Sequence, residues 1–464
     1  MARTERDSLG EVEVPDEALY GAQTARAIEN FPISGRPPHP TLIRATGLIK
    51  AAAARANSEL GLLDTERADA IEAAAREVAA GLHNDQFVVD AINAGAGTSY
   101  NMNANEVIAN LADERLGGRR GTYATIHPND HVNMAQSTND AVPAAIRVAS
   151  VLLVREKVLP ALSRLRDSLK RKAGEFDHIV KTGRTHLQDA VPIRLGQEFA
   201  GYAESVDKNA QRIAAAAQPL TFSNLGGTAA GTGLNSHLNY AATVCRELTL
   251  LAGFQVKPAA NLVEAMQSMS DFAGLSGALR NYALDLSRIA NDLRLLGSGP
   301  RTGLAEIRLP PVQPGSSIMP GKVNPVIAEN VNMVCFKVIG NDTTVAWAVG
   351  AGQLELNVMM PVIADALLES LEILANASQN LALRCVDGIT ADEEMCRYWF
   401  ERSMGLATVL NPHIGYDAAA RVAQRATAEG KTLPEIVREE GILSEEDLAR
   451  VFDPRSMTEP SELR

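Results

Sequence analysis

"LSGALRNYALDLSRIANDLRLL", residues 275–296, carries the strongest structural signal in this chain. Its apolar residues alternate at spacings of four and three, at Leu275, Leu279, Tyr282, Leu286, Ile289, Leu293 and Leu296. This heptad-like seam predicts one long amphipathic helix, which ends in the glycines and proline of "GSGPRTG". At ~1.5 Å per residue, the helix is about 33 Å long. Such a length predicts a bundle of long helices.

Other segments extend the same pattern. Val158, Leu162, Leu165 and Leu169 form a second four-three-four seam, and residues 326–350 are rich in Val, Ala and Met. We therefore predict an all-α chain with a central long-helix bundle. The expected domains are an N-terminal domain at 1–137, the central bundle at 138–393 and a small helical C-terminal domain at 394–464.

Composition supports a large aliphatic core. Hydrophobic residues make up 46% of the 464 residues but aromatic residues only 4%, which suits closely packed helices. The net charge of −12 disfavours nucleic acid or an anionic membrane as a partner. A small anionic substrate stays possible, because a local pocket can be positive on an acidic protein.

The cysteines and the amino terminus indicate the compartment. Cys245, Cys335, Cys385 and Cys396 are widely spaced without a C-x-x-C pair, which predicts neither a zinc site nor a disulfide framework. The amino terminus is charged and lacks an apolar signal region, and no apolar run has transmembrane length. We expect a soluble, cytoplasmic protein.

Four segments rich in small polar residues, here called polar islands, interrupt the helical pattern. They are "GAGTSYNMNANE" (95–106), "HPNDHVNMAQSTND" (127–140), "TGRTHLQDAVP" (182–192) and "PGSSIMPGKVNP" (314–325). The simplest interpretation is helix capping, as Thr138, Asn139 and Asp140 before Pro143 suggest. A capped helix N-terminus also offers free N–H groups and a positive dipole to a carboxylate. The two interpretations are compatible.

Two residues inside the islands have neighbours in the sequence that favour a functional role. A lone histidine is more often structural, but "GRTH" places Arg184, Thr185 and His186 at one bend, with two donors and a titratable imidazole. Lys322 alone would be a surface lysine. In a Gly- and Pro-rich loop with two serines and an asparagine it is better placed to bind an anion.

The island motifs resemble those of the class II fumarase/aspartase superfamily. "GSSIMPGKVNP" is similar to the family signature, and five further motifs follow the family order: "NMNANEVIAN", "HVNMAQSTND", "GRTHLQDAVP", "GGTAAGTGLN" and "VCFKVIGNDTT". The resemblance runs from about Arg3 into the C-terminal domain. It implies a metal-free, cofactor-free homotetramer with a twenty-helix core and active sites each built from three subunits. We expect the two seams to pack against other subunits.

The resemblance also implies roles in the fourth island. Ser316 would be the general base that removes a proton from C3 of a dicarboxylate substrate. The dianionic aci-carboxylate intermediate would be stabilised by N–H groups near Ser317 and Ile318, with Lys322 and Asn324. Positive charge nearby would favour the serine alkoxide. Two glycines, at 315 and 321, would bend a loop that closes over the substrate.

The remaining site residues follow from the other motifs. The resemblance implies that a carboxylate and the leaving group are held by Thr98, Ser137, Thr138 and Asn139. Thr185 and His186 would come from a second subunit, and Glu329 matches the family carboxylate that pairs with this histidine. No metal ligand is expected.

Local motifs favour one family activity. "GTS" (97–99), "STND" (137–140), "DAVP" (189–192) and "VCFKVIGNDTT" (334–344) are similar to aspartases, which implies reversible deamination of L-aspartate to fumarate and ammonia. "GGTA" (226–229) and "HPND" (127–130) are similar to fumarases, where the second forms an accessory anion site; a plain surface turn at His127 is the alternative. Fumarate hydratase, or a lyase adding another amine to fumarate, remains open.

Two departures and one different class complete the hypotheses. Met360 stands where the family usually has a charged residue, and Tyr100 is bulkier than in many relatives, so both predict altered substrate scope. Relatives of this superfamily also serve as lens proteins without catalysis. That role would not need the base and its neighbours, which this chain keeps at Ser316, Lys322, Asn324 and His186.

Overall fold

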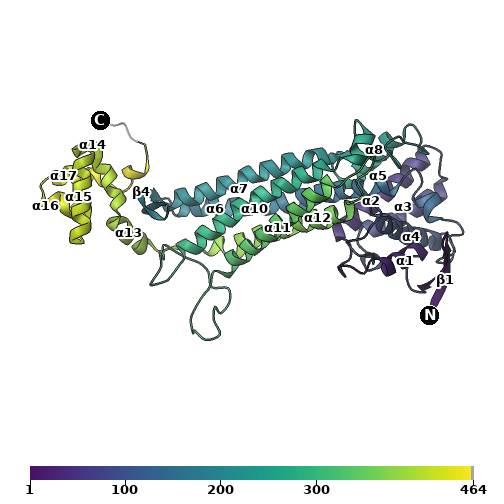
Figure 1. Ribbon diagram of the computed structural model, residues 1–464, viewed down its shortest axis with the longest axis horizontal. Coiled ribbons are helices and arrows are strands. Elements are labelled where there is room, and N and C mark those ends of the chain that lie inside the picture. The colour runs from purple at the N-terminus through teal and green to yellow at the C-terminus, as the bar shows by residue number, and fades with distance from the viewer. Residues whose placement is uncertain (461–464) are drawn as a thin grey trace. The chain divides into compact units, whose positions relative to one another are not determined.

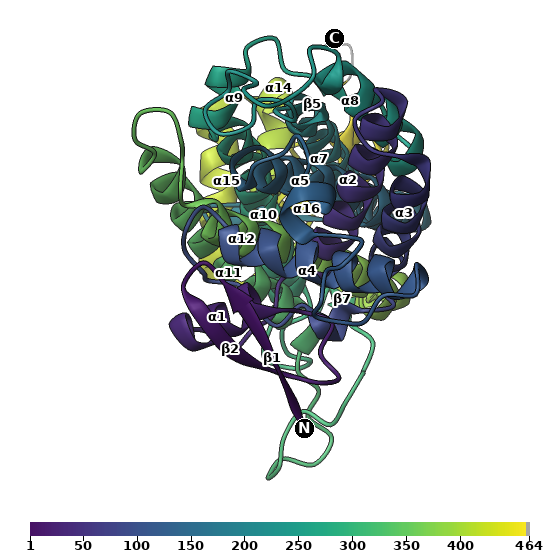
Figure 2. The same ribbon diagram turned by 90° about the vertical axis from the view of Figure 1, so that its right-hand side faces the viewer.

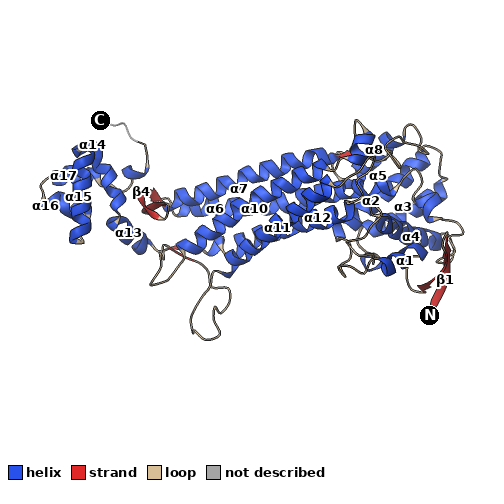
Figure 3. Cartoon of the chain, viewed as in Figure 1, coloured by secondary structure: helices blue, strands red, loops and turns tan. Residues whose placement is uncertain are grey.

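The computed structural model describes residues 1–460 and is dominated by helices (Figure 3). Seventeen α-helices occur in this range, and the strands form only four two-stranded sheets. The predicted all-α class is confirmed, as is the long helix beginning near Leu275, which spans Ser270–Leu296.

The helices differ greatly in length, as Figure 1 shows. They are α1 (Ala22–Asn30), α2 (Pro40–Glu59), α3 (Thr65–Ala79), α4 (Thr98–Arg115), α5 (Thr138–Leu153), α6 (Leu159–Glu175), α7 (Leu195–Ala217), α8 (Tyr240–Ala252), α9 (Leu262–Gln267), α10 (Ser270–Leu296), α11 (Val326–Gly350), α12 (Met360–Arg384), α13 (Glu393–Arg402), α14 (Asn411–Ile414), α15 (Tyr416–Glu429), α16 (Leu433–Glu439) and α17 (Glu445–Val451).

The strands are short and pair locally. They are β1 (Ala2–Asp7) with β2 (Gly10–Pro15), β3 (Val180–Thr185) with β4 (Gln188–Arg194), β5 (Phe222–Ser223) with β6 (Lys257–Pro258), and β7 (Ile307–Arg308) with β8 (Thr390–Ala391). Only β5 and β6 run parallel; the other three pairs are antiparallel.

The described chain divides into two compact units. The first unit comprises Met1–Pro160, Asn209–Ala283 and Cys335–Ala375, and the second comprises Ala161–Lys208, Leu284–Val334 and Asn376–Arg464. The division falls within the long helices α6, α7, α10, α11 and α12. The three-domain division expected from the sequence stays a prediction.

Close helix packing organises the first unit. Helix α2 packs against α3, α5 and α8, and α2 and α3 lie side by side in Figure 2. A Cβ atom at Gly47 of α2 would lie 2.6 Å from the backbone nitrogen of Ala79 in α3. Only glycine permits this approach, so small residues set the distance between the two helices.

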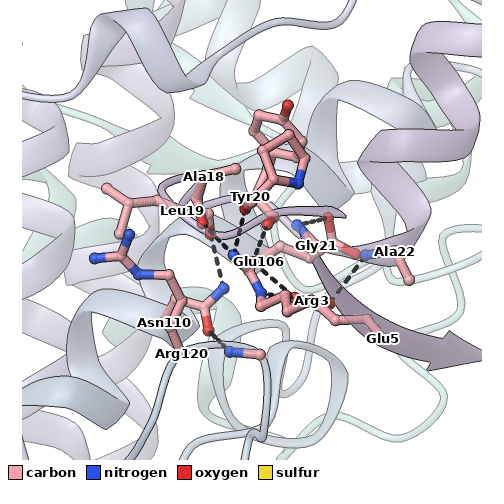
Figure 4. Close-up of polar contacts among 12 residues, drawn as sticks. Arg3, Glu5, Ala18, Leu19, Tyr20, Gly21, Ala22, Glu106, Asn110 and Arg120 are labelled. Atoms are coloured by element: carbon pink, nitrogen blue, oxygen red, sulfur yellow. Dashed lines mark hydrogen bonds and ion pairs between the residues drawn. The ribbon is translucent and has the colours of Figure 1, made fainter. Parts of the chain in front are cut away.

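A buried carboxylate joins α4 to the amino-terminal segment. Glu106 accepts hydrogen bonds from the backbone N–H of Gly21 (2.9 Å), the N–H of Gln23 (2.9 Å) and the hydroxyl of Thr24 (2.6 Å), as Figure 4 shows in part. These donors lie at the start of α1, where a negative charge is favourable, although burial raises the pKa of Glu106. The glutamate of the first polar island is therefore a structural cap.

The second unit carries its own apolar cluster near the C-terminus. Its fully or nearly buried residues are Phe400, Leu406, Leu410, Ala419, Val422, Ala426, Leu433, Ile436, Val437, Leu448 and Val451. This cluster contacts the β3–β4 hairpin through the segment at 404–405. The N–H of Met404 donates to Asp189 (3.3 Å), and a Cβ at Gly405 would lie 2.0 Å from the carbonyl oxygen of Ala190.

The structure corrects the expected partner of the two apolar seams. Every residue of both seams is buried inside this single chain, where each is at most 6% exposed. Helix α11 supplies part of the cover: Ser276 donates to Asp342 (2.7 Å) in the first unit, and Asn332 donates to Ser287 (2.8 Å) in the second. The prediction that these seams pack against other subunits is therefore wrong, because a heptad repeat does not distinguish partners within a chain from partners in another.

Other apolar side chains on the long helices are exposed instead. Phe336 and Trp347 of α11 are 61% and 79% exposed, and Met333 on the same helix is 66% exposed. Leu284 of α10 is 52% exposed. Exposed apolar side chains gathered along a helix indicate a surface that binds another protein.

Two further features bear on the environment of the chain. Within residues 1–460 no helix is both long and apolar enough to cross a membrane. All four cysteines are buried without a disulfide in this range, and burial raises the pKa of each thiol to about 12.

Candidate functional site

Two predicted site segments open helices in the first unit. Ser137 is the N-cap of α5, where its hydroxyl accepts the N–H of Asn139 (3.2 Å). A carboxylate oxygen of Asp140 accepts a hydrogen bond from the N–H of Ser137 (2.9 Å). Thr98 begins α4 and donates its hydroxyl to Gly95 (2.7 Å). The capping interpretation is confirmed for α5, whereas α4 begins after Gly97 without a side-chain cap. The positive end of α5 lies at the predicted carboxylate-binding residues Ser137, Thr138 and Asn139, here called the seat.

Side-chain contacts bring three motifs together there. Asn101 of α4 donates to the hydroxyl of Thr138 (3.2 Å), which joins the first island to the second. The amide nitrogen of Asn139 donates to the carbonyl oxygen of Ala229 (2.9 Å), in the "GGTAAGTGLN" segment. A carbonyl can only accept, so this contact fixes the amide and leaves its oxygen as the free acceptor.

Backbone strain gathers in the same motifs. Of nine non-glycine residues with positive φ in residues 1–460, six lie in the polar islands or in "GGTAAGTGLN". They are Ala96, Ala135, His186, Leu187, Thr228 and Asn235. Such conformations cost about 1–3 kcal/mol each, persist only where the surrounding structure holds them, and cluster at functional sites. Strain therefore supports the islands as the functional part of the chain.

A buried cation and a buried carboxylate lie behind the N-terminus of α5. Lys50 is fully buried, and its ammonium donates to the side-chain oxygens of Asn133 and Gln136 (3.0 Å each). Asp140, also fully buried, accepts the N–H groups of Gly226 (3.1 Å) and Thr228 (3.0 Å). Burial lowers the pKa of Lys50 to about 7 and raises that of Asp140 to about 7.

Sequence reasoning missed Lys50. It stands in "LIKAAAA", where the neighbouring side chains are small or apolar and almost all are buried. A single lysine within such a run is a detectable signal, because buried lysines occur only with dedicated partners.

In the second unit, the β3–β4 hairpin presents the predicted histidine. His186 and Leu187 form the two-residue turn, with φ of 56° and 59°. Turns of this kind favour Asn-Gly, because both central residues need positive φ. Thr185, His186 and Leu187 are all exposed. The strained turn holds the imidazole outward at the tip.

The structure corrects the role of Arg184. Its guanidinium donates to Glu306 (2.7 Å), which is fully buried, and does not accompany His186 at the exposed tip. Lys181 forms an ion pair with the second oxygen of Glu306 (2.8 Å) without hydrogen-bond geometry. Its ammonium donates a hydrogen bond to Glu198 (2.9 Å). A buried carboxylate needs cationic partners, so Arg184 anchors the hairpin.

The fourth island forms a loop closed on itself, drawn in green before α11 in Figure 1. The N–H of Gly315 donates to the carbonyl oxygen of Lys322 (2.8 Å), and the amide of Asn324 donates to the carbonyl oxygen of Gly315 (2.6 Å). The half-buried Ser316 hydroxyl accepts the N–H groups of Ile318 (3.2 Å) and Met319 (2.9 Å). Two donors therefore aim at the oxygen of the predicted base.

The two loop glycines allow the predicted bends of the loop. A Cβ at Gly315 would lie 2.4 Å from the carbonyl oxygen of Lys322, and Gly321 has φ of 79°. Neither position accepts another residue without distortion. Ser317 and Lys322 are exposed. The loop thus presents a hydroxyl and an ammonium to solvent on a closed backbone.

The predicted site residues fall into both units. Those of the first unit are Thr98, Ser137, Thr138 and Asn139; those of the second are Thr185, His186, Ser316, Ser317, Lys322, Asn324 and Glu329. Glu329 is half-buried in the first turn of α11. Its pairing with His186 is expected between subunits and stays a prediction.

Neither proposed marker of altered substrate scope is exposed. Met360 is fully buried at the start of α12, and Tyr100 is 3% exposed. The Tyr100 hydroxyl shares a hydrogen bond with Thr46 (2.7 Å), and its side chain lines a small cavity with Gly97 and Val142. Both residues therefore act first through packing in the first unit.

Imidazole nitrogens in and directly after the "HPND" turn accept hydrogen bonds from backbone N–H groups of the same segment. The N–H of Asp130 donates to Nδ1 of His127 (3.2 Å), and the N–H of His127 donates to Nδ1 of His131 (2.8 Å). These local bonds favour the surface-turn interpretation over an anion site. Within residues 1–460, this turn included, no group of three or more His, Cys, Asp or Glu side chains is arranged to hold a metal ion.

Comparisons with known proteins agree along the whole chain. A family model described as "Lyase" matches residues 10–340, and one described as "Fumarase C C-terminus" matches residues 406–459. An aspartate ammonia-lyase of a Bacillus species is 48% identical over 458 residues, which are 99% of this chain and 98% of that protein. A class II fumarate hydratase of Halobacterium salinarum is 54% identical over 456 residues, 98% of this chain and 97% of that protein.

A solved structure agrees equally well. The crystal structure of a fumarate lyase:delta crystallin protein from Brucella melitensis bound to cobalt superposes with a TM-score of 0.96 at 51% identity. The match covers 99% of this chain and 100% of that one.

Proposed function

Because this chain belongs to the fumarase/aspartase family of lyases, we propose that it is an aspartate ammonia-lyase, which converts L-aspartate reversibly into fumarate and ammonia. The observation that carries the proposal is the set of acceptors at the N-terminus of α5, above all Asn139. Its amide nitrogen donates to Ala229, so its oxygen is left as an acceptor at the start of α5. An ammonium leaving group brings three donors and needs acceptors of this kind.

The base in this mechanism is Ser316. It removes the proton from C3 of aspartate, and the electron pair passes into the adjacent carboxylate as an aci-carboxylate dianion. The N–H groups of Ile318 and Met319 that point at the serine oxygen favour its anionic form. Lys322 and Ser317, exposed on the same loop, supply charge and a donor to the intermediate. The bond from C2 to nitrogen then breaks on the opposite face, as an anti elimination requires.

Two other residue groups complete the proposed site. Thr98, Ser137 and Thr138 hold a carboxylate and the leaving group at the N-termini of α4 and α5. His186, with Thr185, comes from a second subunit, where Glu329 pairs with the imidazole. The exposure of the strained His186 turn in the single chain supports this contribution to a neighbour.

Assembly follows from the same proposal. We infer a homotetramer whose active sites are each shared by three subunits. The exposed apolar side chains Met333, Phe336 and Trp347 on α11 support subunit contacts along this helix, in place of the buried seams.

Fumarate hydratase is the second candidate, favoured by the 54% identity with the Halobacterium salinarum enzyme. Hydration chemistry needs a general acid for the departing hydroxyl. The hydroxyls of Thr98 and Ser137 offer acceptors without an obvious acid, so we place deamination first.

The test offers L-aspartate and L-malate in parallel to the purified protein and follows the absorbance of fumarate, with ammonia measured separately. We expect aspartate to be consumed much faster, because a site built to bind one group rejects an analogue that leaves its partners unpaired by up to ~10⁴-fold. Rapid turnover of malate without ammonia release from aspartate would replace this proposal with fumarate hydratase.

A further inference from the structure

We propose that Lys50 is a positioning residue that holds the substrate-carboxylate seat at the N-terminus of α5 in shape and balances its charge. The inference rests on the proposed function, because it assigns Thr138 and its neighbours to substrate binding. Lys50 touches no predicted substrate atom and acts through the side chains between its ammonium and the seat.

The first argument is a chain of hydrogen bonds. The side-chain oxygen of Asn133 accepts from Lys50 (3.0 Å), Asn101 (3.2 Å) and Asn105 (3.2 Å). An amide oxygen has two lone pairs, so three donors make Asn133 the crowded centre of this network. The same amide of Asn101 reaches the hydroxyl of Thr138 (3.2 Å). Three hydrogen bonds, through Asn133 and Asn101, thus connect Lys50 to a predicted substrate ligand.

A second contact leads to the same place. Lys50 also donates to the side-chain oxygen of Gln136 (3.0 Å), the residue directly before the N-cap Ser137. The ammonium therefore pins both the residue that precedes the cap and, through Asn133 and Asn101, the first residue of the helix.

The third argument concerns charge. Asp140 is fully buried in the first turn of α5, and its ionised form places a negative charge beneath a seat meant for an anion. Its hydrogen-bond donors are the backbone N–H groups of Ser137, Gly226 and Thr228, which carry no net charge. Lys50 is a buried cation whose electrostatic interaction with Asp140 favours the charged form of each. It offsets the carboxylate and leaves the positive end of α5 available to the substrate.

Packing alone does not require a lysine at this position. Its neighbours in α2 are small or apolar, and a methionine would fill similar volume without desolvating an ammonium. The hydrogen-bond acceptors of the buried ammonium are the uncharged amide oxygens of Asn133 and Gln136. Burying the charge with such partners costs folding free energy, which indicates that the charge has a function.

The experiment measures binding of succinate, a dicarboxylate that cannot eliminate, to the assembled enzyme by calorimetry, together with KM and kcat. Lys50→Met removes the charge. Gln136→Glu keeps Lys50 but sets a carboxylate beside it, which cancels the charge at a half-buried position. Lys172→Met is the matched control, because Lys172 is also buried and hydrogen-bonded, to Glu175 and Ile389, in the second unit.

We expect both Lys50→Met and Gln136→Glu to weaken succinate binding and to raise KM on the order of ten-fold, as one unit charge acting over ~10 Å at an effective dielectric constant of ~20 would do. The kcat should change less than KM, and Lys172→Met should alter the melting temperature without altering succinate binding.

Unchanged succinate affinity in Gln136→Glu overturns the charge role, even if Lys50→Met fails to fold. Equal weakening by Lys172→Met also overturns the inference, because loss of any buried lysine would then suffice. If the wild-type enzyme turns over its substrate and binds succinate while both variants behave like it, this inference fails alone. If the wild-type protein binds no dicarboxylate, the proposed function fails and takes the inference with it.

Discussion

The hydroxyl of Ser316 is held as an acceptor before any substrate arrives. The N–H groups of Ile318 and Met319 converge on it, in a turn that the serine itself closes. Removing the hydroxyl therefore has two effects, loss of the base and loss of a turn. A single alanine variant does not separate them.

Ser316→Ala and Ser316→Asn together make that separation. Asparagine can accept the same N–H groups in an Asx turn but cannot serve as the base. Since general base catalysis is worth ~10²–10⁴-fold, we expect both variants to lose at least that factor in kcat while the tetramer persists. Near-normal kcat in Ser316→Asn would show that the hydroxyl only shapes the loop.

At the scale of elements, the β3–β4 hairpin is anchored by ion pairs along β3 and strained at its tip. Lys181 near the open end and Arg184 near the turn both pair with the buried Glu306, while His186 and Leu187 take positive φ at the tip. The anchor resists the tendency of the tip to relax. We expect the ion pair of Arg184, two residues before His186, to help orient the imidazole.

Arg184→Met tests this anchor. The change leaves Glu306 buried with one cation, which should loosen the hairpin and lower kcat by up to ~10²-fold, as small misplacements of catalytic groups do. Arg184→Lys should recover part of the rate, since it restores the charge without the planar fork. The rate of hydrogen exchange at residues 182–190 should rise in Arg184→Met. Faster exchange with full activity would show that the ion pair does not affect catalysis.

At the scale of the whole molecule, assembly depends on side chains that the single chain leaves uncovered. Trp347 and Phe336 are 79% and 61% exposed on α11, whereas the heptad seams are internal. Stable oligomers bury large apolar interfaces, commonly above roughly 2,000 Å².

Trp347→Glu should accordingly weaken the assembly. Light scattering of the wild-type protein should give four times the mass of one chain, and the variant should give smaller, less active species. Tyr416→Glu is the control, because Tyr416 is 76% exposed in α15 and receives the same charge. A monomeric, fully active wild-type protein would contradict both the tetramer and the shared site.

The sequence correctly predicted structural features that depend on a periodic pattern or on a local motif. The α10 seam gave the long helix, and the Ser137 to Asp140 run gave the cap, because both depend on neighbours in the chain. The partner of the seam and the direction of Arg184 depend on residues far away, so spacing alone predicted them wrongly. Lys50 was missed because its partners, Asn133 and Gln136, are more than eighty positions along the chain.

The four buried cysteines have a practical consequence. With their pKa values raised to about 12, the sulfur atoms stay protonated at neutral pH, and the thiolate is the form that reacts with oxidants and alkylating reagents. Burial of the four sulfur atoms and their low thiolate fraction therefore slow the reaction of the folded chain with such reagents. Each sulfur becomes reactive only when its own region opens: Cys335 and Cys385 would report on α11 and on the end of α12, and Cys396 on α13. The chain carries an internal set of reporters for local unfolding.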